Sequence, residues 1–315
     1  ENLINLTFEI EETEKFYIER INIFGNNITR EEVLRNNFLL DEGDGFNELL
    51  QTKTINNIKS LGFFSKVSSE VTNGSSDYQK IININVEERP TGEISAGAGF
   101  GTSGATLAFG VSENNFLGRG IEFASDLTLS TDTVKGTLSL NDPNYKGTNK
   151  SLNFTLESTA TDRLANYGYE SKKIGLTIGS GFELYDDIFF KAGFSTYSEN
   201  LTADSTATAN IKKQDGSYFD AIAHYSFTYD QRNQRYKTTD GYISRFSQAI
   251  PVVSSTDTLI NQYDYKIYNE WLNENIATFA FYAKSADSLS GKYVKLSERL
   301  FMPSKKLRGF ENGRV

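Results

Sequence analysis

The hydrophobic residues of this chain change their spacing near Pro90, and this change limits the possible folds more than any other feature. Before Pro90, one segment carries apolar residues at helical spacing, at Leu50, Ile58 and Leu61. After Pro90, apolar and polar residues alternate, as in the segment 121–129. Strict alternation places the two sets of side chains on opposite faces of a β-strand. The sequence therefore predicts a small α/β domain followed by a long series of strands.

Residues 15–89 carry the local signals of a β-α-α-β-β domain. Thr29 is expected to cap the first helix, and Glu32 completes a capping box with it. Gly62 is expected to end the second helix as a C-terminal cap. The expected elements are a strand at 16–24, a helix after Thr29, a helix at 47–61, and strands at 66–72 and 78–87. They should form a three-stranded sheet with both helices on one face.

Beyond Pro90, roughly eleven alternating segments are separated by loops rich in Asn, Asp, Gly, Ser and Thr. No run of about 18 apolar residues occurs, so a transmembrane helix is not expected. Alternation alone fits a soluble β-sandwich as well as a membrane β-barrel. Transmembrane strands need only ~9–11 residues of alternating character, and a barrel therefore stays open as a reading.

Three features favour the barrel. The expected strands are long, and no helical segments lie between them. Aromatic residues gather near the expected strand ends, as an interfacial girdle requires; they are Tyr167, Tyr169, Tyr185, Tyr197, Tyr229, Tyr242 and Trp271. The face opposite the apolar one is polar, with Lys135, Lys191, Asp220, His224, Arg245 and Lys266.

The composition argues against several kinds of chemistry. The net charge of −9 and the pI of about 4.9 leave no basic stripe for a nucleic acid. There is no cysteine, and His224 is the only histidine, so we expect no disulfide, metal site or catalytic residue. The segment Gly99–Gly104 fits the dinucleotide pattern G-x-G-x-x-G, but a strand and not a helix is expected after it. We therefore expect no cofactor and no enzymatic activity.

Several motifs resemble those of the BamA family of outer-membrane β-barrel assembly factors. Residues 15–89 resemble a POTRA domain, the periplasmic module of that family. The order and spacing of the motifs match over essentially the whole chain. The motifs are Ile23-Phe24-Gly25-Asn26, Leu61-Gly62-Phe63-Phe64, Asn114-Asn115-Phe116-Leu117-Gly118-Arg119-Gly120, Asp142-Pro143-Asn144-Tyr145, Tyr229-Asp230 with Thr239-Asp240-Gly241, and Leu307-Arg308-Gly309-Phe310.

The resemblance implies a division of the chain into three parts. Residues 1–14 would end a preceding POTRA domain, 15–89 would form the last POTRA domain, and 90–315 would form the first part of an outer-membrane barrel. The fold class is then an α+β POTRA domain followed by an incomplete antiparallel transmembrane β-barrel. About eleven of the family's sixteen strands would be present. The chain departs from the family at Thr238, where the family often has proline.

The resemblance also implies a function and its site residues. The protein would insert β-barrel proteins into the bacterial outer membrane, its clients being unfolded outer-membrane proteins that pair with a lateral-gate strand. That strand would comprise Gly92, Ile94, Ala96, Gly97, Ala98, Gly99, Phe100 and Gly101. A periplasmic BamD-like lipoprotein would dock at Arg35 and Glu42. The sixth extracellular loop would carry a lumen motif of Arg308, Gly309 and Phe310. Outer-membrane lipid would surround the barrel.

Two other functions remain open on the sequence. One is a translocation pore, of either the two-partner secretion type or the TamA type. The other is an enzyme fused to such a barrel, as in patatin-like surface lipases. The enzyme would need a nucleophile motif, and no G-x-S-x-G occurs in these residues.

Overall fold

The computed structural model describes residues 14–101, 104–234, 237–272, 275–291, 293–300 and 302. The chain divides into two compact units. The first contains the described residues up to Thr91 together with Asn114–Gly120. The second contains Gly92–Glu113 and the described residues from Ile121 onward. Each unit is described by itself below.

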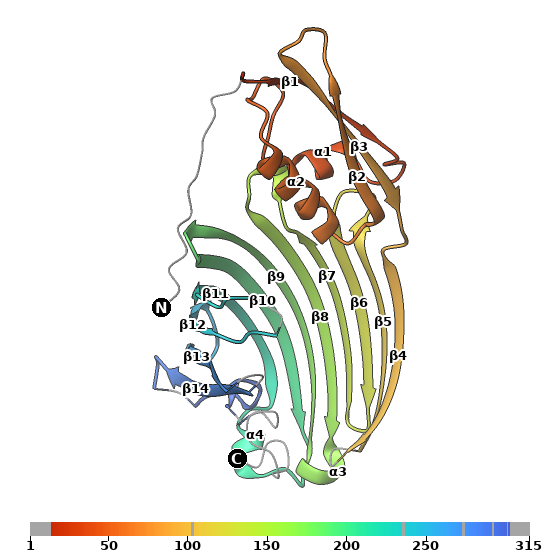
Figure 1. The fold of residues 1–315 in the computed structure, drawn as a ribbon. Helices are drawn as coiled ribbons and strands as arrows, with labels where there is room; N and C mark the ends of the chain where they lie inside the picture. Colours follow the sequence, from red (N-terminus) through yellow and green to blue (C-terminus); the bar gives the residue numbers. More distant parts are fainter. Residues whose placement is uncertain are drawn as a thin grey trace, which may run out of the picture. The chain divides into compact units, whose positions relative to one another are not determined.

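The first unit has the expected β-α-α-β-β order (Figure 1). Its strands pair in the order β1-β3-β2, with β1 parallel to β3 and β2 antiparallel to β3. Asn47 caps α2 by accepting a hydrogen bond from the Leu50 amide, and Gly62 follows the helix with φ +75°. The elements are β1 Tyr17–Phe24, α1 Glu31–Arg35, α2 Glu48–Ser60, β2 Phe64–Asn73 and β3 Gln79–Glu88.

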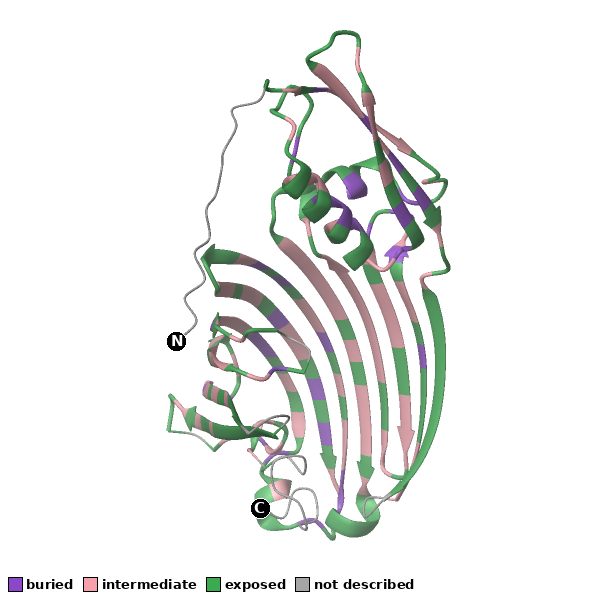
Figure 2. Cartoon of the chain, viewed as in Figure 1, coloured by how far each residue is buried: buried purple, intermediate pink, exposed green. Residues whose placement is uncertain are grey.

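A single hydrophobic core holds the first unit together. It combines one face of each strand with the apolar sides of both helices, and its most buried members include Ile18, Leu34, Ile58 and Ile84. Figure 2 shows buried residues on both helices and on the strands of this unit. Each fully buried aliphatic side chain of this size contributes roughly 1.5–3 kcal/mol. This core is sufficient to explain why the segment forms a compact unit.

The start of α1 differs from the expected capping box. The N-cap residue is Arg30, and its side chain makes no capping hydrogen bond. The amide of Thr29 donates instead to the Glu88 carboxylate at 2.6 Å, and the Arg30 amide donates to the Gly118 carbonyl at 2.8 Å. Glu88, distant in sequence, therefore accepts from the Thr29 amide that Glu32 would have satisfied in a capping box. The assignment of Thr29 as the N-cap was wrong.

The second unit is built around one antiparallel sheet of eleven strands, as expected (Figure 1). The strands follow one another in chain order from β4 to β14, and no pairing joins β4 to β14 among the described residues. They are β4 Gly92–Gly101, β5 Gly104–Phe116, β6 Ile121–Ser130, β7 Thr133–Asp142, β8 Ser151–Arg163, β9 Tyr169–Tyr185, β10 Ile188–Ala203, β11 Gly216–Asp230, β12 Gly241–Val253, β13 Thr258–Leu272 and β14 Asn275–Ser288. Short helices lie between some of them: η1 Tyr145–Gly147, α3 Leu164–Tyr167, α4 Ala209–Lys212 and η2 Leu296–Glu298.

The apolar face of this sheet has no core to pack against. Its side chains remain open: Phe279 is 62% exposed and Ile174 is 53% exposed. No second sheet covers them in the described part of the second unit. The sandwich reading is thereby excluded, because a sandwich buries one face of each sheet. An apolar surface of this extent suits a hydrocarbon environment, and every strand has at least the ~9–11 residues needed to cross one.

Aromatic side chains contact one another on the apolar face of the large sheet, here called the outer face. The rings of Phe190 and Phe227 lie 4.9 Å apart, and those of Tyr229 and Tyr242, at the ends of adjacent strands, lie 5.5 Å apart. Tyr169, which is 8% exposed on the inward side of β9, was wrongly assigned to the aromatic girdle, and so was Tyr197. Tyr197 lies opposite Asp220 in the β10–β11 register and lines an inner cavity, under the ammonium of Lys173 at 4.0 Å. None of the helices in the described residues has the length and apolar character to cross a membrane.

Candidate functional site

Strand β4 forms one edge of the large sheet within the described residues. It pairs with β5 alone, from Gly92 opposite Glu113 to Gly101 opposite Gly104. Ile94 and Phe100 are 83% and 91% exposed on the apolar face. The G-x-G-x-x-G segment thus connects two strands of a hairpin, and β5 occupies the place where a dinucleotide-binding loop needs a helix.

Two glycines of β4, Gly97 and Gly99, leave their face of the strand unfilled. A methyl group added at Gly97 or Gly99 would meet no atom within 4 Å. Some glycines in the middle of the sheet are overlaid by neighbours: a methyl group at Gly175 would overlap the Tyr197 ring, and one at Gly193 would overlap His224, whereas Gly136 of β7 is as open as Gly97 and Gly99. Side-chain pairs across strands contribute roughly 0.2–1 kcal/mol each. Strand β4 therefore offers fewer such anchors than the strands at the middle of the sheet.

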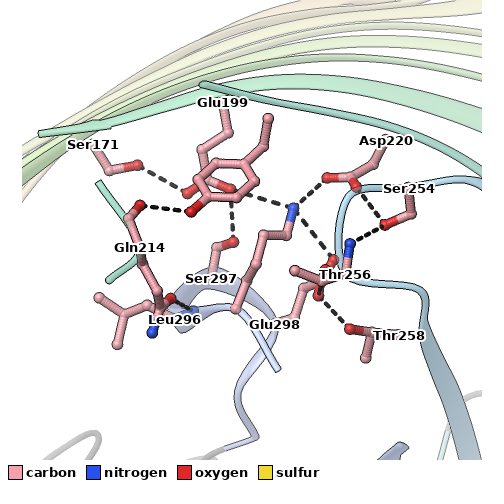
Figure 3. Close-up of polar contacts among 12 residues, drawn as sticks. Ser171, Glu199, Gln214, Asp220, Ser254, Thr256, Thr258, Leu296, Ser297 and Glu298 are labelled. Carbon is pink, nitrogen blue, oxygen red and sulfur yellow. Dashed lines mark hydrogen bonds and ion pairs between the residues drawn. The ribbon is translucent and has the colours of Figure 1, made fainter. Parts of the chain in front are cut away.

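The inner face of β10 and β11 carries a buried ionic cluster (Figure 3). Its centre is the ammonium of Lys295, which lies just before η2. This group hydrogen-bonds to Asp220 and lies 3.8 Å from Glu199 and 3.5 Å from Glu298. It also lies 5.2 Å from the centre of the Tyr218 ring. Lys295, Glu199 and Asp220 are each less than 5% exposed.

Hydroxyl groups complete the hydrogen bonding of the three carboxylates, as Figure 3 shows. Glu199 accepts from two serines, Asp220 from one serine, and Glu298 from two threonines. These donors are Ser171, Ser297, Ser254, Thr256 and Thr258. No buried side-chain nitrogen or oxygen in the described part of the chain lacks a partner. Burial opposes the charge of Lys295, but the hydrogen bond to Asp220 and the neighbouring carboxylates raise its pKa.

Two polar cavities lie on the inner face of the sheet. One has a volume of about 620 Å³ and is bordered by Lys191, Gln262 and Lys284. The other has a volume of about 470 Å³ and is bordered by Lys173 and by the residues around η2. His224 borders both cavities, as expected for a polar residue of the barrel interior. The inner face thus carries many polar side chains, whereas the outer face is apolar.

Arg35 and Glu42, the expected docking residues of the first unit, lie together. Their charged groups are 3.9 Å apart, and both side chains are nearly half exposed. Both also contact the outer edge of β1: Glu42 accepts from the Ile21 amide at 3.0 Å, and Arg35 donates to the Ile21 carbonyl at 3.1 Å. These residues therefore stabilise the edge of their own sheet, in addition to any role with a partner.

A chain of polar contacts in the first unit includes the segment Asn114–Gly120. The buried amide of Asn115 donates to the Thr29 hydroxyl at 2.8 Å and accepts from the Gly120 amide at 2.8 Å. Thr29 in turn donates its backbone amide to Glu88. Gly118 has φ +68°, and a side chain there would overlap the Ile28 carbonyl. This explains why the segment requires glycine and asparagine.

Some of the expected residues lie outside the described part of the chain. Arg308, Gly309 and Phe310 lie outside the described residues, as does most of the segment 1–14. In the described ranges, no group of three or more histidine, cysteine or acidic residues could hold a metal ion. The sequence analysis missed the Lys295 cluster, whose acidic members are dispersed at Glu199, Asp220 and Glu298. Its one local signal was the spacing of Lys295 and Glu298, which is common on exposed surfaces.

Two family profiles match the chain. The Omp85 superfamily domain matches residues 115–315. A POTRA profile, described as a surface antigen variable number repeat, matches residues 16–89. Together these matches leave only short stretches at the beginning of the chain and around β4 and β5 uncovered.

Curated relatives carry the name outer membrane protein assembly factor BamA. The chain is 23% identical to that of Neorickettsia risticii, over 98% of this chain and 42% of the relative. It is 27% identical to that of Neisseria meningitidis serogroup B, over 71% of this chain and 28% of the relative. The chain thus spans less than half the length of these relatives.

Solved structures share the fold. The crystal structure of BamA from Haemophilus ducreyi lacking POTRA domains 1–3 superposes with a TM-score of 0.76 at 21% identity, covering 89% of this chain and 57% of that one. CdiB from Acinetobacter baumannii superposes with a TM-score of 0.57 at 10% identity, covering 94% of this chain and 57% of that one. At these identities the likeness concerns the fold.

Proposed function

We propose that this chain, which belongs to the Omp85 superfamily, is part of a protein that assembles and inserts β-barrel proteins into the bacterial outer membrane. The POTRA and Omp85 regions make it an outer-membrane protein with a periplasmic POTRA domain. Its similarity to assembly factors named BamA supports the activity. The clients would be unfolded outer-membrane proteins.

The observation that carries this proposal is the composition and packing of β4. An exposed strand edge presents unpaired amide and carbonyl groups with which a client strand can pair. In a membrane, unpaired backbone groups are costly, so a seam opens only where its pairing is weak. The unfilled faces at Gly97 and Gly99 weaken the side-chain contacts that β4 can make. In the intact protein, β4 would separate from the last barrel strand, its neighbour on the side away from β5, and would pair with a client strand instead.

A disulfide across the seam tests this proposal. These 315 residues contain no cysteine, and any cysteine in the rest of the full-length protein would first be replaced by serine, so that the introduced pair has no competing thiol. Ala98→Cys would be combined with a cysteine on the last barrel strand of the full-length protein. We expect the oxidised protein to lose client insertion into proteoliposomes and to regain it on reduction. Insertion of clients at the normal rate by the locked protein would refute opening at this seam.

A matched control uses the same residue of β4. Ala98 lies opposite Leu107 of β5, so Ala98→Cys with Leu107→Cys locks a strand pair that stays together in either state. This lock should leave insertion unchanged. Inactivation by both locks would indicate general damage to β4.

We also propose partner and loop contacts for the intact protein. Arg35 and Glu42 would bind a periplasmic BamD-like lipoprotein, since both are charged and nearly half exposed. Arg308, with Gly309 and Phe310, would anchor the sixth extracellular loop in the lumen. A guanidinium buried there would need a carboxylate or carbonyl partner, because an unpaired buried charge is costly.

A translocation pore is the second candidate. The observation in its favour is the polar inner face, whose two cavities are bordered by Lys173, Lys191 and Lys284. A pore of the two-partner secretion or TamA type would use this face as the path of its substrate. The seam lock separates the two candidates, because translocation through the lumen would continue with the seam closed.

A further inference from the structure

The residues at 293–299, here called the strap, connect to the inner wall of the second unit at three separate places. Lys295 and Ser297 contact Glu199 at the end of β10. The Leu296 amide donates to the side chain of Gln214, before β11, at 2.8 Å. Glu298 accepts from the threonines around the start of β13. The strap thus bridges elements that are distant in sequence (Figure 3).

The strap is attached by polar groups and not by hydrophobic burial. Among its described residues, Lys295 alone is buried. Tyr293 is 43% exposed, and Val294 and Leu296 are half-buried. Hydrophobic contact is spread over many atoms, whereas this attachment is concentrated in one charged cluster. A change at one residue can therefore release the whole segment.

Lys295 compensates the negative charges of the cluster. Glu199 and Asp220 belong to the wall, and Glu298 belongs to the strap. The Lys295 ammonium is the cation that contacts all three. Without it, the strap carboxylate would be held against two wall carboxylates of the same sign in a buried site. Removing one partner of a buried ion pair is strongly destabilising because the remaining charges stay desolvated.

The strap also forms one wall of an inner cavity. Ser297, Glu298 and Arg299 border the cavity of about 470 Å³. This cavity and the one of about 620 Å³ share His224 and Lys284 in their linings. If the strap left the wall, this side of the smaller cavity would lose its boundary.

We propose that Lys295 holds a movable strap against the inner wall, and that the strap in this position closes the cavity of about 470 Å³. The charge on this lysine decides whether the strap stays on the wall. Lys295 is a positioning residue: it holds the chain that leads toward the loop motif at Arg308. The strap would operate in the same way whether the protein inserts barrels or passes chains through its lumen. The proposal therefore goes beyond the proposed function and does not depend on it.

Thiol labelling of the full-length protein in lipid nanodiscs tests whether Lys295 holds the strap against the wall. Val294→Cys places a single cysteine on the strap, since residues 1–315 contain no other and any cysteine elsewhere in the protein would first be replaced by serine. Its reaction rate with a water-soluble maleimide measures how often the strap leaves the wall. Lys295→Met in this background should raise the rate about 100-fold or more, as expected when a buried ion pair loses one partner. Adding Glu298→Gln should lower that raised rate by about ten-fold, because it removes the like-charge repulsion.

Lys284→Met is the matched control, because it removes a lysine that borders the same cavity without belonging to the cluster. It should leave the labelling rate unchanged, and heat-modified gel mobility should confirm a folded barrel in every variant. A rate for Lys295→Met equal to that of the parent, or an equal rise for Lys284→Met, would overturn the proposal.

A second variant keeps the test decisive if Lys295→Met does not assemble. Ser297→Ala keeps every charge and removes the hydrogen bond to Glu199. It should raise the labelling rate by about ten-fold, the effect of one hydrogen bond to a charged group. The absence of any rise would also overturn the proposal.

Discussion

Replacing Glu88 with glutamine should loosen the turn that precedes α1. The Glu88 carboxylate accepts hydrogen bonds from the amides of Asn27, Ile28 and Thr29, at 3.0, 2.9 and 2.6 Å. Glutamine would turn an NH₂ group toward some of these donors. A hydrogen bond to a charged group contributes ~1.5–3 kcal/mol, and the site is partly open to water, so we expect a loss of about 2 kcal/mol.

Hydrogen exchange measures this loss where it occurs. A decrease of about 2 kcal/mol should speed exchange of the amides at 27–29 by about 30-fold near neutral pH. Glu87→Gln is the control: Glu87 is exposed and lies 3.7 Å from Lys66, a surface pair expected to contribute little. Unchanged exchange in Glu88→Gln would show that the carboxylate does not hold the turn.

The stabilisation of this turn by Glu88 should also depend on pH. Burial acts against ionisation of Glu88, but the hydrogen bonds donated by Thr29 and Ile28 outweigh it and lower the pKa of this carboxyl. A lowered pKa in the folded state means that the stabilisation is present above the pKa of the unfolded chain. It is lost as the pH falls through the lower, folded value. The difference between the parent and Glu88→Gln should therefore disappear in acid, and a constant difference down to about pH 2 would contradict this account.

Two further predictions concern the first unit. Gly118→Ala should lower the free energy of unfolding of this unit by about 3 kcal/mol in chemical denaturation, because the new methyl group overlaps the Ile28 carbonyl. Gly43→Ala is the control: Gly43 has φ +98° but open space around it, so the loss should be only about 1–2 kcal/mol. Equal losses would show that backbone strain alone is responsible. Glu42→Gln keeps an acceptor for the Ile21 amide but removes the charge, so co-purification of the BamD-like lipoprotein should fall by about ten-fold while β1 amide exchange stays unchanged. Normal co-purification by this variant and by Arg35→Gln would refute docking at these residues.

Much of the fold could be predicted because its signals are local. The change of period near Pro90 gave the order of elements in the first unit and the eleven strands of the second. The error at Tyr197 could have been avoided: Phe190, Ala192 and Phe194 alternate on the outer face, so an odd-numbered position in the same strand faces inward. The alternation already contained that information.

Other features depend on contacts between distant residues. The prediction that Thr29 caps α1 was wrong because Glu88, about sixty residues later, accepts hydrogen bonds from the amides at 27–29. The Lys295 cluster combines charges from β10, β11 and the strap, and nothing in the sequence near Glu199 or Asp220 distinguishes them from solvated acids. The faces of β4 could be predicted from alternation, whereas the empty space beside Gly97 became evident only in three dimensions.

The closed edge of β1 has a consequence for how copies of the first unit can associate. Residues 43–46 hydrogen-bond to Phe16 and Ile18, and Glu42 and Arg35 occupy the amide and carbonyl of Ile21. Open-ended polymerisation through β-sheets requires two free edges on every molecule, one to accept and one to extend. With these positions of β1 occupied, a further strand would pair more readily at β2, and pairing of two copies through β2 would end at a dimer. The domain could therefore stay at high local concentration beside unfolded chains without seeding a fibre.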